Sequence, residues 1–216
     1  SIIMQVQPPE EVVIVIDGPV CAELRQTILS FSANESIDIH FLSQNVGRGD
    51  ARNFGIRASQ GEYFAIMDAD DVSRPDRFFK QMAIMRESNL DLLGGGIEEF
   101  KSSVGDSSVT RKVPLIEKDI RRLVPYRSPF NHVTLVVRRS IFNKVCGYNS
   151  LRFVEDWDFC FRVLNADARV ANISDILVDV KSVPGRRHSF SYFLEEVFLL
   201  WSARKRKQIT SFQLVI

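Results

Sequence analysis

Apolar and polar positions alternate along the first part of the chain in a way that predicts strands separated by helices. Val12–Ile16 is β-branched throughout, which is typical of a strand buried on both faces. Ile37–Leu42 alternates as a short strand, and residues 63–68 predict a third strand that ends in acidic residues. The helices expected between these strands cover residues 20–34 and 47–59. This alternation predicts an α/β fold whose strands pair in parallel through right-handed crossovers.

The remaining elements follow a less regular pattern. Ser73 at a cap position and Pro75 in the first turn predict a helix whose apolar stripe contains Phe78, Met82 and Met85. Further strands are expected at residues 91–95, 133–137, 169–173 and 176–180, further helices at 117–124, from 153 onward and at 189–207, and a loop at 101–108.

The composition indicates a globular chain of 216 residues, 45% of them apolar, with a net charge of +1. The near-zero charge gives no overall field for nucleic acid. Cys21, Cys146 and Cys160 form no CxxC pair, which argues against a disulfide framework or a zinc site and fits a reducing cytosol. No apolar run reaches the length of a transmembrane helix.

Three carboxylates, Asp68, Asp70 and Asp71, follow directly after the third predicted strand. Ligands of open α/β sheets bind beyond the carboxyl ends of the strands. Magnesium-like ions are often held by one or two carboxylates together with substrate phosphates. The cluster is therefore a candidate metal–phosphate site, although a solvated acidic turn with Asp71 or Ser73 capping the next helix explains the same pattern.

Four stretches carry a family resemblance. Residues 13–18 form an apolar strand that ends in Asp-Gly, residues 45–56 read NVGRGDARNFGI, residues 68–70 read DAD, and residues 155–158 read EDWD. In this order and spacing, over about residues 10–165, the chain resembles a family 2 glycosyltransferase of the bacterial surface-polysaccharide type, with the GT-A fold. Members begin with a further strand, central in the sheet, and a helix; since residues 1–5 resemble only the tail of that helix, the resemblance implies that this first strand is missing.

The resemblance implies an enzyme that uses a nucleotide-sugar donor, most simply a UDP-sugar, and Mn²⁺ or Mg²⁺. Asp70 would ligate the metal, Asp68 would contact the ion or the ribose, and a late His188 is a further candidate ligand. Asp17 would accept a hydrogen bond from the uracil or a ribose hydroxyl, and Arg52 would donate to the nucleotide. An ordinary turn acid at Asp17, a surface arginine and a surface histidine are the simpler alternatives.

The same resemblance places the proton transfer in the EDWD segment. In inverting members the Asp of this motif, here Asp156, is the general base for the acceptor hydroxyl, and Glu155 precedes it at the start of a helix. Acids are also common in first helical turns because backbone dipoles favour them there. Trp157 is compatible with stacking on a sugar or with the core.

We expect a donor-binding α/β half at residues 1–110, an acceptor-side half at 111–188 and a C-terminal helix at 189–216. The acceptor implied by the resemblance is a growing glycan or a lipid-linked sugar. The basic run 204–207 follows an apolar helical stretch, so the last helix is a candidate for peripheral contact with the inner face of the cell membrane; a solvated helix end is the alternative.

Two other functions remain open from the sequence. Phosphatases of the haloacid dehalogenase type also place DxD after an apolar strand, but there that strand comes first, whereas here two strands are expected before it. A chain without its first strand is alternatively an inactive or weakly nucleotide-binding domain.

Overall fold

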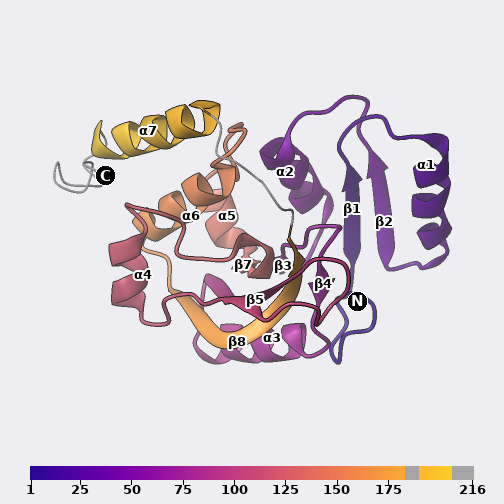
Figure 1. The fold of residues 1–216 in the computed structure, drawn as a ribbon, viewed down its shortest axis with the longest axis horizontal. Helices are drawn as coiled ribbons and strands as arrows, with labels where there is room; N and C mark the ends of the chain where they lie inside the picture. Colours follow the sequence, from indigo (N-terminus) through magenta and orange to yellow (C-terminus); the bar gives the residue numbers. More distant parts are fainter. Residues whose placement is uncertain (183–189, 206–216) are drawn as a thin grey trace.

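The strands of the described residues form two separate sheets in the computed structural model, which describes residues 1–182 and 190–205 (Figure 1). β1 (Val12–Ile16) and β2 (Ile37–Phe41) form a parallel pair. The second sheet has the strand order β3-β7-β5-β8-β4, with β6 added to β5. Its strands are β3 (Tyr63–Ala65), β4 (Val72–Ser73), β5 (Leu92–Phe100), β6 (Val109–Arg111), β7 (Val136–Arg138) and β8 (Val170–Lys181).

The expected α/β class is confirmed, but the second sheet is more mixed than the alternating pattern predicts. β5 and β8 run parallel, whereas β3 is antiparallel to β7 and β4 is antiparallel to β8. The prediction of parallel pairing is therefore wrong for β3, and β4 was not predicted as a strand. Periodicity along the chain reports which face of a strand is buried, but it carries no information about a pairing partner that lies far away in the sequence.

The helices cover both faces of the six-stranded sheet, with α3 on one side and α5 and α6 on the other (Figure 1). Their bounds are α1 (Ala22–Leu29), α2 (Arg48–Ala58), α3 (Arg77–Glu87), α4 (Glu117–Leu123), α5 (Arg139–Lys144), α6 (Glu155–Asn165) and α7 (Phe190–Lys205), with short 3-10 turns at Ser30–Ala33 and His132–Thr134. α6 is buried on almost every side, and its apolar residues share a core cluster with Leu199 and Leu200 of α7.

Several predicted boundaries differ from the structure. Ser73 lies in β4, not at a helix cap; α3 begins at Arg77 after Asp76, and no side chain caps it. A 3-10 turn takes the first part of the strand expected at 133–137, and the two short strands expected at 169–180 are one continuous strand, β8. Helix α5 was not predicted, because its six residues are too short to show a helical period.

A large cavity of ≈ 1770 Å³ separates the two sheets. No backbone ladder joins β1 to β3 within the part of the chain that the structure describes, and both strands line the cavity together with the acidic turn that follows β3. None of the described helices is long and apolar enough to cross a bilayer.

Candidate functional site

The acidic turn after β3 spreads its three carboxylates in different directions. Asp68 accepts a hydrogen bond from Arg52 (3.2 Å), and the exposed Asp70 lines the cavity beside it. Asp71 also lines the cavity, and it accepts from the backbone N–H of Lys181 in β8 (2.9 Å). Burial raises the pKa of Asp71 to about 6, and the Lys181 amide opposes this shift. All three carboxylates therefore border the cavity, and Asp71 in addition anchors the turn to β8.

Asp17 lies at the end of β1, on another wall of the same cavity. Its carboxylate accepts from the backbone N–H groups of Val46 (2.7 Å) and Gly47 (3.0 Å), which shape the loop before α2. Gly18 follows with φ +103°, and a Cβ there would lie 2.8 Å from the amide nitrogen of Asn45. The Asp-Gly pair thus allows the strand end and the loop to approach closely.

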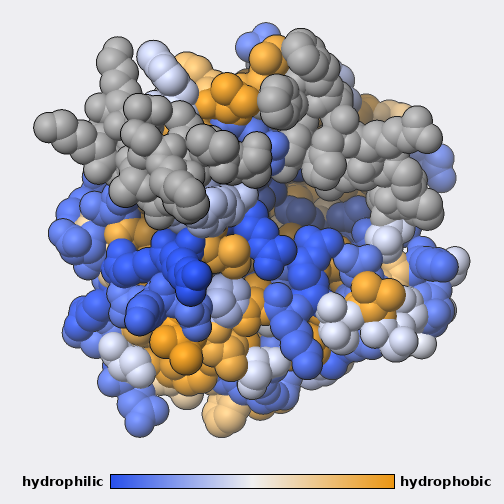
Figure 2. Space-filling model, turned by 60° about the vertical axis from the view of Figure 1, so that its left-hand side comes forward, coloured by the Kyte–Doolittle hydropathy of each residue, from blue (hydrophilic) through white to orange (hydrophobic). Residues whose placement is uncertain are grey.

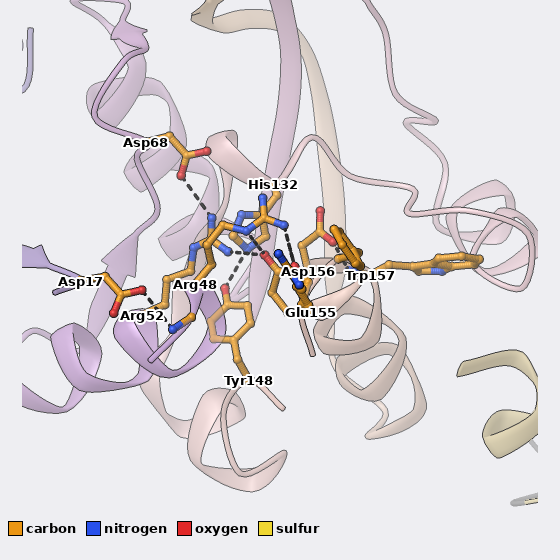
Figure 3. A network of polar contacts seen from close by, with 12 residues as sticks. Asp17, Arg48, Arg52, Asp68, His132, Tyr148, Glu155, Asp156 and Trp157 are labelled. Carbon is orange, nitrogen blue, oxygen red and sulfur yellow. Dashed lines mark hydrogen bonds and ion pairs between the residues drawn. The ribbon is translucent and has the colours of Figure 1, made fainter. Parts of the chain in front are cut away.

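Arg52 on α2 connects the acidic turn to the EDWD segment (Figure 3). Its Nη2 donates to Asp68, and its Nη1 donates to Glu155 Oε1 (3.0 Å). Arg48, one helical turn earlier, contacts the same Glu155 oxygen through Nε (3.1 Å). Burial tends to lower the pKa of Arg52, but charge interactions with Asp68, the Tyr148 phenol group and Glu155 outweigh it and raise the pKa.

Glu155, the first residue of α6, is therefore bound by both Arg48 and Arg52. Its side chain is buried, and burial together with the neighbouring Asp156 raises its pKa, while Arg48 and Arg52 act in the opposite direction. A carboxylate held by two guanidinium groups positions its neighbours rather than exchanging protons with a ligand. The assignment of Glu155, together with Asp156, as a catalytic residue stays a prediction.

Asp156 is the carboxylate of this segment that has no ion-pair partner within the described residues. One of its oxygens accepts from the backbone N–H of Trp157 (2.8 Å). Burial raises its pKa, and that amide, Arg52 and Arg48 counteract the shift. A half-buried carboxylate with a raised pKa and a vacant oxygen has the properties required of a general base.

Three further residues complete the site and were not singled out for it by their pattern. Tyr148 stacks on Phe159 and faces Arg52, and its hydroxyl lies 2.9 Å from His132 Nε2. Asn53 holds the backbone of Tyr148 from both sides, donating to its carbonyl and accepting from its amide, each at 2.8 Å. Asn53 follows Arg52 in the recognised motif, so the motif itself is the signal that could have identified this link.

The structure thus gathers Asp17, Arg52, Asp68, Glu155 and Asp156 around one region, as Figure 3 shows for these side chains. Trp157 belongs to the core, where its Nε1 donates to the Val124 carbonyl (2.8 Å). His188 lies outside the described residues. No three His, Cys, Asp or Glu side chains gather as a ready-made metal site in the described part of the chain.

The sequence model of "Glycosyl transferase family 2" matches residues 1–146. The chain belongs to this family. It is 30% identical over 201 residues to the UDP-Gal:alpha-D-GlcNAc-diphosphoundecaprenol beta-1,3-galactosyltransferase of Escherichia coli, a match that covers 91% of this chain and 73% of that protein. It is 28% identical to the amylovoran biosynthesis glycosyltransferase AmsE of Erwinia amylovora, covering 92% and 76% of the two chains.

The length of this family 2 member differs from that of several relatives. It is 32% identical to a glycosyltransferase of Haemophilus influenzae, of which it spans 66%. Among solved structures, S. aureus TarS 1–349 in complex with UDP-GlcNAc superimposes with a TM-score of 0.72 at 20% identity, over 98% of this chain and 62% of that one. At this identity the superposition establishes a shared fold, and that fold is the expected one.

Proposed function

We propose that this family 2 member transfers a sugar from a UDP-sugar to a glycan or lipid-linked acceptor, with inversion and with a divalent metal. The observation that carries the proposal is the convergence of Asp17, Asp68, Asp70 and Arg52 on one cavity. Arg52 also binds Glu155, the neighbour of Asp156, so Asp156 lies close to this group, as Figure 3 shows. UDP-GlcNAc binding by TarS and the UDP-Gal donor named for the E. coli relative support a uridine nucleotide. We assign donor binding to residues 1–110 and the acceptor side to 111–188.

The donor set of the acidic turn suits Mn²⁺ or Mg²⁺. Asp68 and Asp70 supply two carboxylates on the cavity wall, and a hard cation takes its remaining oxygen ligands from the donor diphosphate and water. When bound, such an ion would neutralise charge on the leaving diphosphate as a Lewis acid. We also propose that His188, which lies outside the described residues, contributes to this site.

The protein's own groups carry the other steps. Asp17 accepts a hydrogen bond from the uracil or ribose, while its two loop contacts hold the carboxylate in place. Asp156 removes the proton of the acceptor hydroxyl as that oxygen attacks the anomeric carbon. Glu155 keeps Arg48 and Arg52 in position beside the transferring group, so that positive charge lies close to the leaving diphosphate.

Helix α7 offers a surface for a membrane that carries lipid-linked acceptors. Its exposed apolar residues are Leu194, Val197, Phe198 and Trp201, spaced along one helical face. Figure 2 shows apolar surface at the top of the view, where this helix lies. The sequence continues with the basic run 204–207, which suits anionic lipid headgroups. We propose peripheral contact with the inner face of the cell membrane through this helix.

A panel of nucleotide sugars, assayed for Mn²⁺-dependent hydrolysis and transfer, tests the function. We expect Asp156→Asn to retain calorimetric binding of UDP with MnCl₂ and to lose transfer by about 10²-fold or more. Asp70→Ala is expected to lose the metal-dependent part of UDP binding, whereas Asp119→Asn, on the distant helix α4, serves as the control. Transfer at the wild-type rate by Asp156→Asn would refute the assignment of the base.

A further inference from the structure

A completely buried arginine lies beneath the acidic turn. Arg77, the first residue of α3, has no solvent exposure. Its Nη2 donates to the carbonyl of Ile66 (3.0 Å), and its Nη1 contacts Met67 Sδ (3.4 Å). These two residues join the end of β3 to Asp68, so the guanidinium lies against the segment from which the acidic turn starts.

This guanidinium has no carboxylate partner among the described residues. Its polar contacts are the Ile66 carbonyl, the Met67 sulfur and the Gln81 amide oxygen, and it also lies 5.1 Å from the centroid of the Phe78 ring. Burial lowers the pKa of Arg77 to about 9, so the group still carries its charge at neutral pH. A buried, unpaired cation is costly for folding, and a well-packed apolar side chain usually serves stability better. Packing alone therefore does not explain an arginine at this place.

A chain of side-chain amides extends the contact across the sheet. Arg77 Nε donates to Gln81 Oε1 (3.0 Å), one helical turn later. Gln81 Nε2 donates in turn to the carbonyls of Thr134 (2.8 Å) and Leu93 (3.3 Å). Arg77 thus ties the end of β3 to β5 and to the 3-10 turn that precedes β7, the strand next to β3.

The far end of the acidic turn is fixed by other residues. Ser73 pairs with Val178 in β8, and Arg74 binds Asp179 (2.7 Å) as well as Glu98. Asp71 is held by the Lys181 amide in the middle of the turn. Contacts other than those of Arg77 therefore fix the end of the turn. At its beginning, Arg77 binds the Ile66 carbonyl, while the Ile66 N–H donates to Leu135 (2.9 Å) and Arg52 donates to Asp68.

We propose that Arg77 is a positioning residue that fixes the beginning of the acidic turn. Through the Ile66 carbonyl and the Met67 side chain, it sets the direction in which Asp68 and Asp70 enter the cavity. The positional part stands on the contacts alone, whereas the consequence for donor binding rests on the proposed function.

Hydrogen exchange of the backbone amides of residues 67–72 tests the positional part in the 216-residue chain. Arg77→Met removes the donors and the charge but keeps a long side chain. Met85→Ala, a fully buried residue of the same helix that packs on Leu90, Leu93 and Val136, is the control for loss of stability. We expect exchange in residues 67–72 to rise at least 10-fold in Arg77→Met and to stay near wild type in Met85→Ala, with Arg77→Lys in between.

Equal exchange of residues 67–72 in Arg77→Met and Met85→Ala, at matched urea stability, would overturn the proposal. Calorimetry with UDP and MnCl₂ tests the consequence: we expect at least 10-fold weaker binding in Arg77→Met and partial recovery in Arg77→Lys. Unchanged binding in Arg77→Met would contradict a role in the donor site. Absence of binding in the wild-type chain would instead count against the proposed function, and the exchange experiment would still decide whether Arg77 fixes the turn.

Discussion

Replacing Glu155 by Gln isolates the charge that holds two arginines at the centre of the site. Gln keeps the size and one acceptor oxygen of Glu155, so the perturbation is the loss of a buried negative charge. Its side chain is 2% exposed and that of Arg52 is 16% exposed, with 3.0 Å between the paired atoms. Removing one partner of a buried ion pair costs about 3–5 kcal/mol.

Two features reduce this cost. Arg52 retains Asp68 as a second partner at 3.2 Å, and Arg48, whose side chain is 45% exposed, can return to water. An exposed pair of this kind contributes at most about 1 kcal/mol. We therefore expect Glu155→Gln to lower the free energy of unfolding by about 2–3 kcal/mol. For a chain of this size, Tm should fall by about 4–12 °C.

Urea unfolding and a thermal melt measure the effect, and a double-variant cycle identifies its cause. If the cost arises from an uncompensated Arg52 charge, Arg52→Met added to Glu155→Gln should cost at least about 1 kcal/mol less than the sum of the single variants. A loss below about 0.5 kcal/mol in Glu155→Gln, or additive single variants, would refute the buried-pair reasoning.

Two further predictions follow from the surrounding core. Burial, Arg52 and Arg48 hold the pKa of His132 well below its usual value, so below about pH 6.5 the unfolded chain binds a proton that the folded chain does not. The free energy of unfolding should therefore fall with pH, by up to about 1.4 kcal/mol per pH unit from this group. Urea titrations at pH 7, 6 and 5 should show a smaller fall in His132→Gln than in the wild type. Equal falls in the two proteins would contradict the prediction. Gly95→Ala places a Cβ 2.9 Å from Cγ of the buried Leu177. This overpacking should lower the free energy of unfolding by about 1–3 kcal/mol in the same urea assay. A urea midpoint equal to that of the wild type would show that β8 can shift to accommodate the Cβ.

Local patterns predicted most of the secondary structure of this chain. Val12–Ile16 is a strand with the expected bounds, and α2 and α4 begin and end within a residue or two of the expected positions. The run of β-branched residues marks the strand, and Gly47 and Gly61 flank α2. Strand pairing was predicted less well. Whether β3 pairs with β1 or with β7 depends on contacts between distant segments, which a one-dimensional pattern does not contain.

In the candidate site too, local motifs could be predicted from the sequence, whereas contacts between distant segments could not. Carboxylates at the ends of strands and at the start of α6 are visible as motifs, and the structure gathers them. The contacts of Arg77 and His132 could not be predicted, since both depend on burial by residues far along the chain. Because most polar residues are exposed, a sequence alone predicts exposure for such a residue, and only the packing around it shows that it is buried.

The separation of β1 and β2 from the larger sheet has a mechanical consequence. Backbone ladders make a sheet stiff, but here the pair carrying Asp17 is connected sideways through α2, which packs on β1 and is bonded to Tyr148 by Asn53. A tilt of that helix would change the spacing between Asp17 and the acidic turn and would, in the same movement, shift Arg52 against Glu155. The position of α2 therefore determines both the spacing between Asp17 and the acidic turn and the contact between Arg52 and Glu155.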